Sequence, residues 1–89
     1  MRSVLIIVIS LFLVGCSDYQ RARSAYEGGD YKKAFELFKK LSESGDTRSE
    51  YDLSLMYLQG IGTKQDVGQG WFWMIKSAEH GNTMAMVEL

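Results

Sequence analysis

The 89-residue sequence contains no proline, a single cysteine and a single histidine. Without proline, no residue breaks a helix by removing a backbone donor. One cysteine cannot form an intrachain disulfide, and one histidine is too few for a zinc site, which needs three or four ligands. The formal net charge is −1, so no basic surface argues for a nucleic-acid partner. The length leaves room for one small domain.

Long apolar runs are also scarce, and the one that occurs lies at the start of the chain. Val4 to Val14 is apolar except for Ser10, and Arg2 supplies a positive charge ahead of it. Eleven helical residues rise about 16 Å, whereas a bilayer core is about 30 Å thick. The run is therefore short for a stable membrane span and is typical of the apolar region of a secretory signal peptide.

The apolar run ends in Leu13-Val14-Gly15-Cys16, which resembles the lipobox of bacterial lipoproteins. The resemblance implies that diacylglycerol is attached to the Cys16 thiol, that a signal peptidase cuts between Gly15 and Cys16, and that the new amino group is acylated. Residues 1–15 would then be a cleaved signal peptide, and residues 16–19 a lipidated tether. Two or three acyl chains anchor a protein stably. The alternative is an ordinary cysteine at the edge of a signal anchor.

Ser17, which follows the expected lipidation site, bears on sorting. In lipoproteins of diderm bacteria, an aspartate at that place favours retention in the inner membrane. The resemblance therefore predicts an outer-membrane lipoprotein that faces the periplasm, while a Gram-positive host would leave the protein on the cell surface. The covalent lipid on Cys16 is the one non-protein group expected; no metal and no other cofactor is predicted.

The chain after the tether repeats itself with an offset of 36 residues. Asp30 to Asp46 aligns with Asp66 to Asn82, and both segments carry large apolar residues at helical spacing. An aspartate opens each segment as an N-cap. A glycine, Gly45 or Gly81, closes it where a left-handed residue is wanted. We therefore predict two equivalent helices.

The segments before these two helices also correspond, and they differ in the length of one turn. Tyr26 and Tyr57 each end a predicted helix. Asp30 follows Tyr26 by four residues, whereas Asp66 follows Tyr57 by nine, so the second unit has five extra residues in its turn. Three consecutive units result: a short-turned hairpin at residues 20–45, a long-turned hairpin at residues 46–81, and the start of a truncated third unit at residues 82–89.

Eleven residues of the second unit form one motif of aromatic, apolar, small and turn residues: Tyr51, Leu53, Met56, Tyr57, Gly60, Gly62, Asp66, Trp73, Ala78, Glu79 and Gly81. In this register they resemble a Sel-1-like repeat, a close relative of the tetratricopeptide repeat. Gly70 replaces an alanine of that pattern, at an expected cost of about 1 kcal/mol in helix propensity. The resemblance implies an all-α fold, a short α-solenoid of antiparallel helix pairs. Its first helices would line a concave surface that binds proteins or peptides.

The glycine-rich turn, MYLQGIGTKQD at residues 56–66, does not match a phosphate-binding loop. Lys64 follows a threonine and the preceding segment is helical, whereas a Walker A lysine follows a glycine after a strand. No Ser-x-x-Lys or Gly-x-Ser-x-Gly arrangement occurs in the sequence. The carboxylates are expected to face solvent, and His80 is expected to be an exposed residue near a helix end. We therefore predict no catalytic activity and no small-molecule substrate.

Three adjacent aromatic residues, Trp71, Phe72 and Trp73, stand in the second predicted helix of the long-turned hairpin. Successive residues differ by about 100° around a helix, so the three side chains cannot all face one core. Trp73 occupies the tryptophan position of the motif and is expected to be buried. Trp71 and Phe72 either pack against the third helix or an adjacent repeat, or one of them is an exposed anchor for a partner.

These observations predict a membrane-anchored, non-catalytic protein-interaction module of the bacterial envelope, with an unknown protein or peptide partner. Two alternatives are a cell-wall hydrolase or β-lactamase-like enzyme, and a degenerate repeat protein without function. Solenoid repeats share their cores, so about three or more are usually needed for stability. Two and a half repeats predict a marginal domain that gains stability from a partner, from self-association, or from the missing continuation of a longer parent protein.

Overall fold

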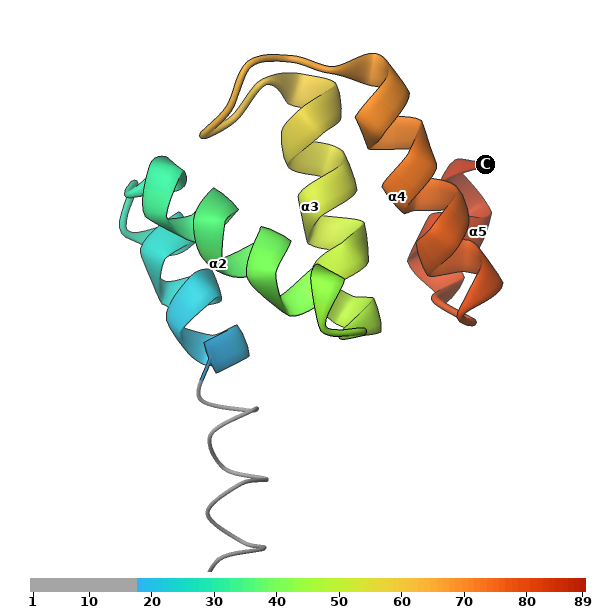
Figure 1. The fold of residues 1–89 in the computed structure, drawn as a ribbon, viewed down its shortest axis with the longest axis horizontal. Coiled ribbons are helices and arrows are strands. Elements are labelled where there is room, and N and C mark those ends of the chain that lie inside the picture. Colours follow the sequence, from blue (N-terminus) through green and yellow to red (C-terminus); the bar gives the residue numbers. More distant parts are fainter. Residues whose placement is uncertain (1–17) are drawn as a thin grey trace, which may run out of the picture.

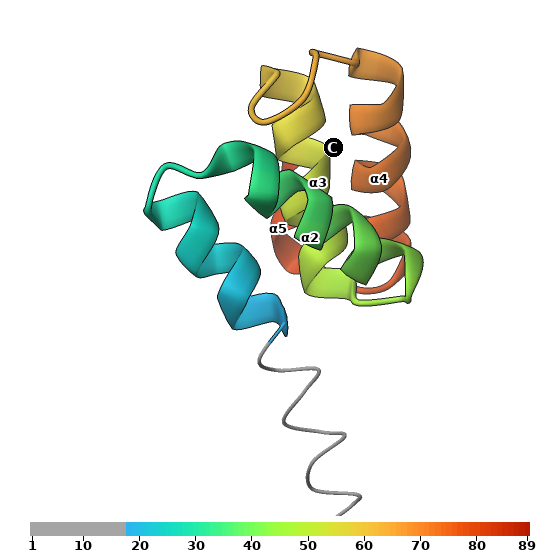
Figure 2. The same cartoon turned by 60° about the vertical axis from the view of Figure 1, so that its left-hand side comes forward.

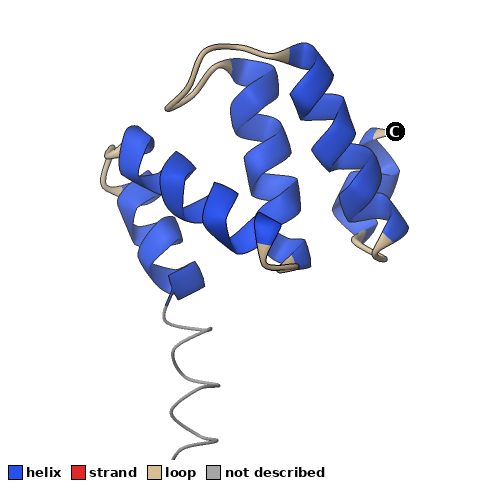
Figure 3. Cartoon of the chain, in the orientation of Figure 1, coloured by secondary structure: helices blue, strands red, loops and turns tan. Residues whose placement is uncertain are grey.

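The computed structural model describes residues 18–89, and every regular element in that range is an α-helix (Figures 1 and 3). Residues 18–27 form the first helix, and the later helices are α2 (Tyr31–Glu43), α3 (Thr47–Gln59), α4 (Val67–Glu79) and α5 (Thr83–Glu88). The all-α prediction is confirmed over this range. The predicted signal peptide and the lipidation residues Gly15 and Cys16 lie outside the described residues.

Each of the helices α2 to α5 begins after an aspartate or asparagine whose side chain accepts a hydrogen bond from a backbone N–H. Asp66 Oδ1, for example, accepts from Gln69 N at 3.0 Å. Such caps satisfy donors that have no partner inside the helix and contribute about 1 kcal/mol each. The four capping residues are Asp30, Asp46, Asp66 and Asn82.

Successive helices run in opposite directions, and α3 lies in the middle of the array (Figures 1 and 2). It packs against α2 on one side and α4 on the other, while α5 packs against α4. A helix between two neighbours needs small residues where backbones approach, and Ser49 and Ser54 of α3 are both fully buried. Its central position explains why α3 is buried around much of its circumference.

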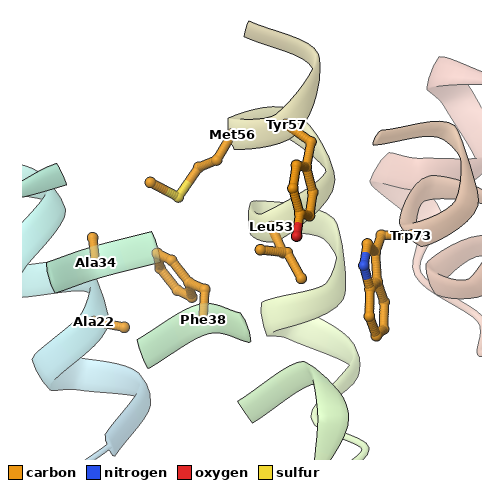
Figure 4. Packing of buried hydrophobic residues seen from close by; sticks show 7 residues of the cluster. All are labelled: Ala22, Ala34, Phe38, Leu53, Met56, Tyr57 and Trp73. Carbon is orange, nitrogen blue, oxygen red and sulfur yellow. The ribbon is translucent and has the colours of Figure 1, made fainter. Parts of the chain in front are cut away.

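The core lies between the two hairpins and takes side chains from the first helix and from α2, α3 and α4 (Figure 4). Phe38 of α2 and Leu53 of α3 are fully buried, and the Phe35 and Tyr57 rings meet edge to face with centroids 5.2 Å apart. Full burial of one large apolar side chain contributes about 1.5–3 kcal/mol. The cluster comprises Ala22, Ala34, Phe38, Leu53, Met56, Tyr57 and Trp73.

The long turn between α3 and α4 closes on itself and packs on the preceding hairpin. Asp66 N donates to the Tyr57 carbonyl at 2.9 Å, so the two residues that bound the extra segment are bonded to each other. Ile61, at the tip of the turn, packs against the core. Gly62 has φ 74°, and a Cβ there would collide with the Tyr31 carbonyl oxygen at the start of α2. The turn is thus a contact between repeats as well as a connection.

The helix ends differ slightly from the prediction. The first helix passes Tyr26 by one residue, and α3 passes Tyr57 by two and ends at Gln59. Gly60, in the left-handed region at φ 69°, stops α3 and donates its N–H to the Met56 carbonyl. The helix therefore ends where a residue that tolerates positive φ occurs, and not at the tyrosine.

Gly70 has a role in packing that its low helix propensity relative to alanine did not predict. A Cβ at Gly70 would lie 2.5 Å from Cδ2 and 2.6 Å from Cγ of Leu58, so the glycine makes room for that side chain between α3 and α4. The corresponding residue of the first hairpin is Ala34, which is also fully buried. The packing at that position accommodates a Cβ. The smaller residue allows a larger one to interlock across the helix pair.

Candidate interaction groove

A hollow of about 180 Å³ lies between the first helix, α2 and α3. Its floor is apolar, since Phe38 is fully buried and Met56 is 2% exposed. Figure 4 shows the Met56 side chain extending from α3 toward α2, next to Phe38. Polar side chains form the rim. The lining residues are Arg23, Tyr26, Phe38, Asp52, Leu55, Met56 and Gln59.

Asp52 is the polar centre of this groove, and its side chain is only 16% exposed. Tyr19 Oη donates a hydrogen bond to Asp52 Oδ2 at 3.1 Å, which links the first helix to α3. Burial raises the pKa of Asp52, although the Tyr19 hydrogen bond and the Arg23 charge act in the opposite direction. Burial, reinforced by the Asp52 carboxylate, also raises the pKa of Tyr19.

Arg23 lies at the rim beside Asp52 and is only loosely held. Its guanidinium lies 3.7 Å from Asp52 Oδ1 and 3.5 Å from Glu27 Oε1, both longer than a normal hydrogen bond. It also lies 6.0 Å from the centroid of the Tyr26 ring. A guanidinium has five N–H donors in a planar fork, so Arg23 can turn donors toward a carbonyl or carboxylate in the groove.

The volume and the lining of the groove limit what it can hold. Its volume is below the 300–1,000 Å³ usual for small-molecule and cofactor sites. None of its lining side chains is a serine, cysteine or histidine, so no nucleophile–base pair is present there. Within residues 18–89, no three His, Cys, Asp or Glu side chains are placed to hold a metal ion. In the same range, no helix is long and apolar enough to cross a bilayer.

His80 and Glu50 correct the expectation that the carboxylates face solvent. Glu50, in the first turn of α3, is fully buried, and its two carboxylate oxygens lie 2.9 and 3.0 Å from His80 Nδ1. His80 caps the C-terminus of α4 and its side chain is 42% exposed, as predicted, while its Nδ1 faces this carboxylate. A buried carboxylate without a partner would be costly, so this pair ties the start of α3 to the end of α4.

Most of the motif residues predicted from the sequence lie in the core, in turns or at caps, and not in the groove. Met56 alone also lines the groove. Leu53, Tyr57 and Trp73 are buried, whereas Tyr51 and Ala78 are half-buried. The remaining positions are turn, cap and helix-end residues: Gly60, Gly62, Asp66, Glu79 and Gly81.

The candidate partner anchors Trp71 and Phe72 are 40% and 53% exposed on α4, away from the groove residues. Phe72 packs edge to face on Trp73 with centroids 5.2 Å apart. Sequence reasoning singled out these aromatic residues and missed Arg23 and Asp52. Helical spacing places Asp52, Leu55 and Gln59 on one face, but only the packed structure shows that the first helix lies against it.

Comparisons with known proteins agree with this architecture. A family model of the Sel1 repeat matches residues 19–46 and 47–82. A sel1-like repeat-containing protein of Acanthamoeba polyphaga mimivirus is 34% identical over 52 residues, which are 58% of this chain and 9% of that protein. The crystal structure of a Sel1 repeat protein from Oxalobacter formigenes matches with a TM-score of 0.76 and 29% identity, over 80% of this chain and 22% of that one.

The chain thus spans less than a quarter of the length of either relative. The two family matches cover most of residues 18–89, and the solved relative has the same helical arrangement. Sel1 repeats point to a protein-interaction module, and such repeats are generally non-catalytic. The chain belongs to the Sel1 repeat family.

Proposed function

We propose that this protein is a lipid-anchored interaction module of the bacterial envelope, which holds a segment of a partner protein in the groove between its first helix and α3. The observation that carries the proposal is the groove itself, with its apolar floor at Phe38 and Met56 and its polar rim at Arg23 and Asp52. A hollow of this size accepts one apolar side chain, while the rim groups can bond to the peptide backbone on either side of it.

Membership in the Sel1 repeat family supports the choice of a protein partner. The lipobox at Leu13 to Cys16 supports the anchor. The residue after the cysteine is Ser17 and not aspartate, which supports the outer membrane, facing the periplasm, as the location. The function follows from these parts: the lipid fixes the repeats at the membrane, and the groove brings a partner to them without a chemical step.

Site-specific photo-crosslinking in intact cells tests the groove. A photoreactive residue is placed at Leu55, which lines the groove, and in a matched strain at Lys39, which is exposed on α2. We expect a discrete crosslinked protein from position 55 that is absent from position 39. Met56→Glu, which puts a charge on the groove floor, should abolish that product. A product of equal yield from both positions would contradict a partner in the groove.

Labelling with palmitate tests the anchor. The wild-type protein should incorporate the label and fractionate with the outer membrane, whereas Cys16→Ser should do neither. Incorporation by Cys16→Ser would refute lipidation at this residue. Because the anchor and the groove are assayed separately, either part of the proposal can fail without the other.

A further inference from the structure

The first helix begins very close to the expected lipidation site. Asp18 and Tyr19 are already helical, although the sequence predicted a tether up to residue 19, so Ser17 is the only residue between Cys16 and the helix. An extended chain spans at most about 3.6 Å per residue, so the Cα atoms of Cys16 and Asp18 lie within about 7 Å of each other. The link between the proposed lipid and the folded domain is therefore very short.

The start of the first helix is also fixed to the rest of the domain. Tyr19 Oη donates to Asp52 Oδ2 at 3.1 Å, and the Tyr19 ring meets the Phe38 ring edge to face with centroids 6.1 Å apart. The Arg48 guanidinium lies 4.1 Å from the centroid of the same tyrosine ring. Contacts to α2 and α3 thus begin at the third residue after Cys16, and the helix cannot swing away from the domain without breaking them.

The groove lies a short way along this same helix. Arg23 and Tyr26, which line the groove, follow Asp18 by five and eight residues. At about 1.5 Å of rise per residue, these intervals correspond to roughly 8 and 12 Å. Together with the short link, they place the Cα atoms of both groove residues within about 20 Å of the Cα of Cys16, whichever way the domain is tilted on the membrane.

Polar side chains around the helix start keep the domain outside the hydrocarbon of a bilayer. A hollow at this point is lined by, among others, Asp18, Arg21, Lys40 and Ser44. Arg21 forms an ion pair with Asp18 at 3.1 Å, and both side chains are exposed. Moving such charged groups into hydrocarbon is costly. The proposed anchor therefore holds the domain at the level of the headgroups, with the groove in the first 20 Å or so of aqueous space.

We propose that the partner of the groove is itself attached to the same membrane, and that the groove holds a segment of it that lies next to its membrane anchor. This inference rests on the proposed function and names the class of partner. A small folded domain is about 30 Å across, which is more than the height of the groove above the bilayer. A soluble partner would have to place its bound segment between its own body and the membrane, whereas a segment that leaves a membrane anchor passes through this layer.

The small size of the groove favours a partner that is confined to the same membrane. A hollow of about 180 Å³ holds little more than one side chain, so its contacts alone give a weak affinity. Attachment of both proteins to one membrane, with the groove and the segment at the same height, raises the effective concentration of one for the other. Weak contacts at the Met56 floor and the Arg23 rim are then enough for binding.

Photo-crosslinking of the lipidated full-length protein from position 55 identifies the partner and the part of it that lies in the groove. We expect mass spectrometry to place the crosslinked residue within about 15 residues of a transmembrane segment or a lipidated cysteine, because 20 Å corresponds to about 6 extended or 13 helical residues. In a strain that lacks the present protein, the partner should still fractionate with membranes.

The outcomes of this mapping separate the two proposals. A crosslinked partner that fractionates as a soluble protein, or a crosslinked residue far from any membrane anchor, would overturn the inference and leave the proposed function intact. The absence of any product specific to position 55 would refute the proposed function, and the inference with it.

A spacer inserted between Ser17 and Asp18 tests the short link directly. A helical spacer of about 20 glutamate, alanine and lysine residues moves the groove by up to about 30 Å from the anchor. We expect the yield of the crosslinked product to fall by roughly threefold or more, while palmitate labelling is unchanged. The same spacer after Leu89 is the matched control and should leave the yield as it is. An undiminished yield with the first spacer, or equal losses with both, would overturn the inference.

Discussion

The second helix of each hairpin is capped by an aspartate, Asp30 or Asp66, but the two hairpins differ in the turn and on the outer face. In the first hairpin, three residues connect the helices, and the outer face of α2 carries Glu36 and Lys39. In the second, seven residues connect α3 to α4, and the same outer positions carry Phe72 and Ile75. The capping aspartate is kept in both units, whereas the long turn, which contacts the preceding hairpin, and the apolar residues of the outer face occur only in the second.

Matched substitutions in the two turns are expected to give the largest difference in the free energy of unfolding. Gly62→Ala introduces a Cβ against the Tyr31 carbonyl and forces a non-glycine residue to φ 74°, so we expect a loss of roughly 2–4 kcal/mol in the free energy of unfolding. Gly29→Ala in the short turn is the matched control. Gly29 has φ 87° but open space around its Cβ position, so it should lose only about 1–2 kcal/mol. Chemical denaturation measures both, and equal losses would show that the Tyr31 contact is unimportant.

The second hairpin also has a contact between a buried carboxylate and a histidine ring, Glu50 and His80, that the first lacks. His80→Ala leaves the Glu50 carboxylate buried without its partner, and we expect a loss of about 1–3 kcal/mol in the free energy of unfolding. The control is Ser44→Ala at the corresponding place in the first hairpin, which is exposed and should change stability by less than about 0.5 kcal/mol. In the Glu50→Gln background the cost of His80→Ala should fall. An unchanged cost would mean that the two side chains are not coupled.

The helix caps should affect the two hairpins equally. Asp30→Ala and Asp66→Ala each remove an acceptor for a backbone N–H at the start of the second helix of a hairpin. We expect each variant to lose about 1 kcal/mol in thermal or chemical unfolding. A marked inequality between the two losses would show that the caps are not equivalent and would weaken the comparison.

The smallest effect is expected at Asp52, and it depends on pH. Burial raises the pKa of Asp52 above its ordinary value of 3.8, so the stability that this group contributes is present below pH 3.8 and is lost as the pH rises through the folded-state pKa. Asp52→Asn removes this titration. The melting temperature of the variant relative to wild type should therefore increase with pH across the acid range and level off toward neutrality. Glu27→Gln, at the other carboxylate near Arg23, is the control; the same pH profile there would refute the assignment to Asp52.

The sequence predicted those parts of the fold that depend on local chemistry. Asp30 and Asp66 were identified as caps because an aspartate before an apolar helical pattern has a backbone donor to accept from. The offset of 36 residues then predicted where along the sequence the two hairpins lie. The burial of Glu50 was not predictable, because its position in the first turn of α3 resembles that of an exposed charge until α4 brings His80 to it. The groove was missed for the same reason: Arg23 and Asp52 come together through packing of two helices separated by α2.

The contact between Gly62 and the start of α2 has a consequence for any longer array of such units. A solenoid multiplies the small rotation between neighbouring repeats along its whole length, so a shift of a few degrees at each step changes the overall curvature. Here the turn of one repeat touches the backbone of the repeat before it, at a point where no side chain can yield. The seven-residue turn therefore helps to set the angle between neighbouring repeats. In a longer array, the curvature of the concave surface would then depend on these loops as much as on the helices that line it.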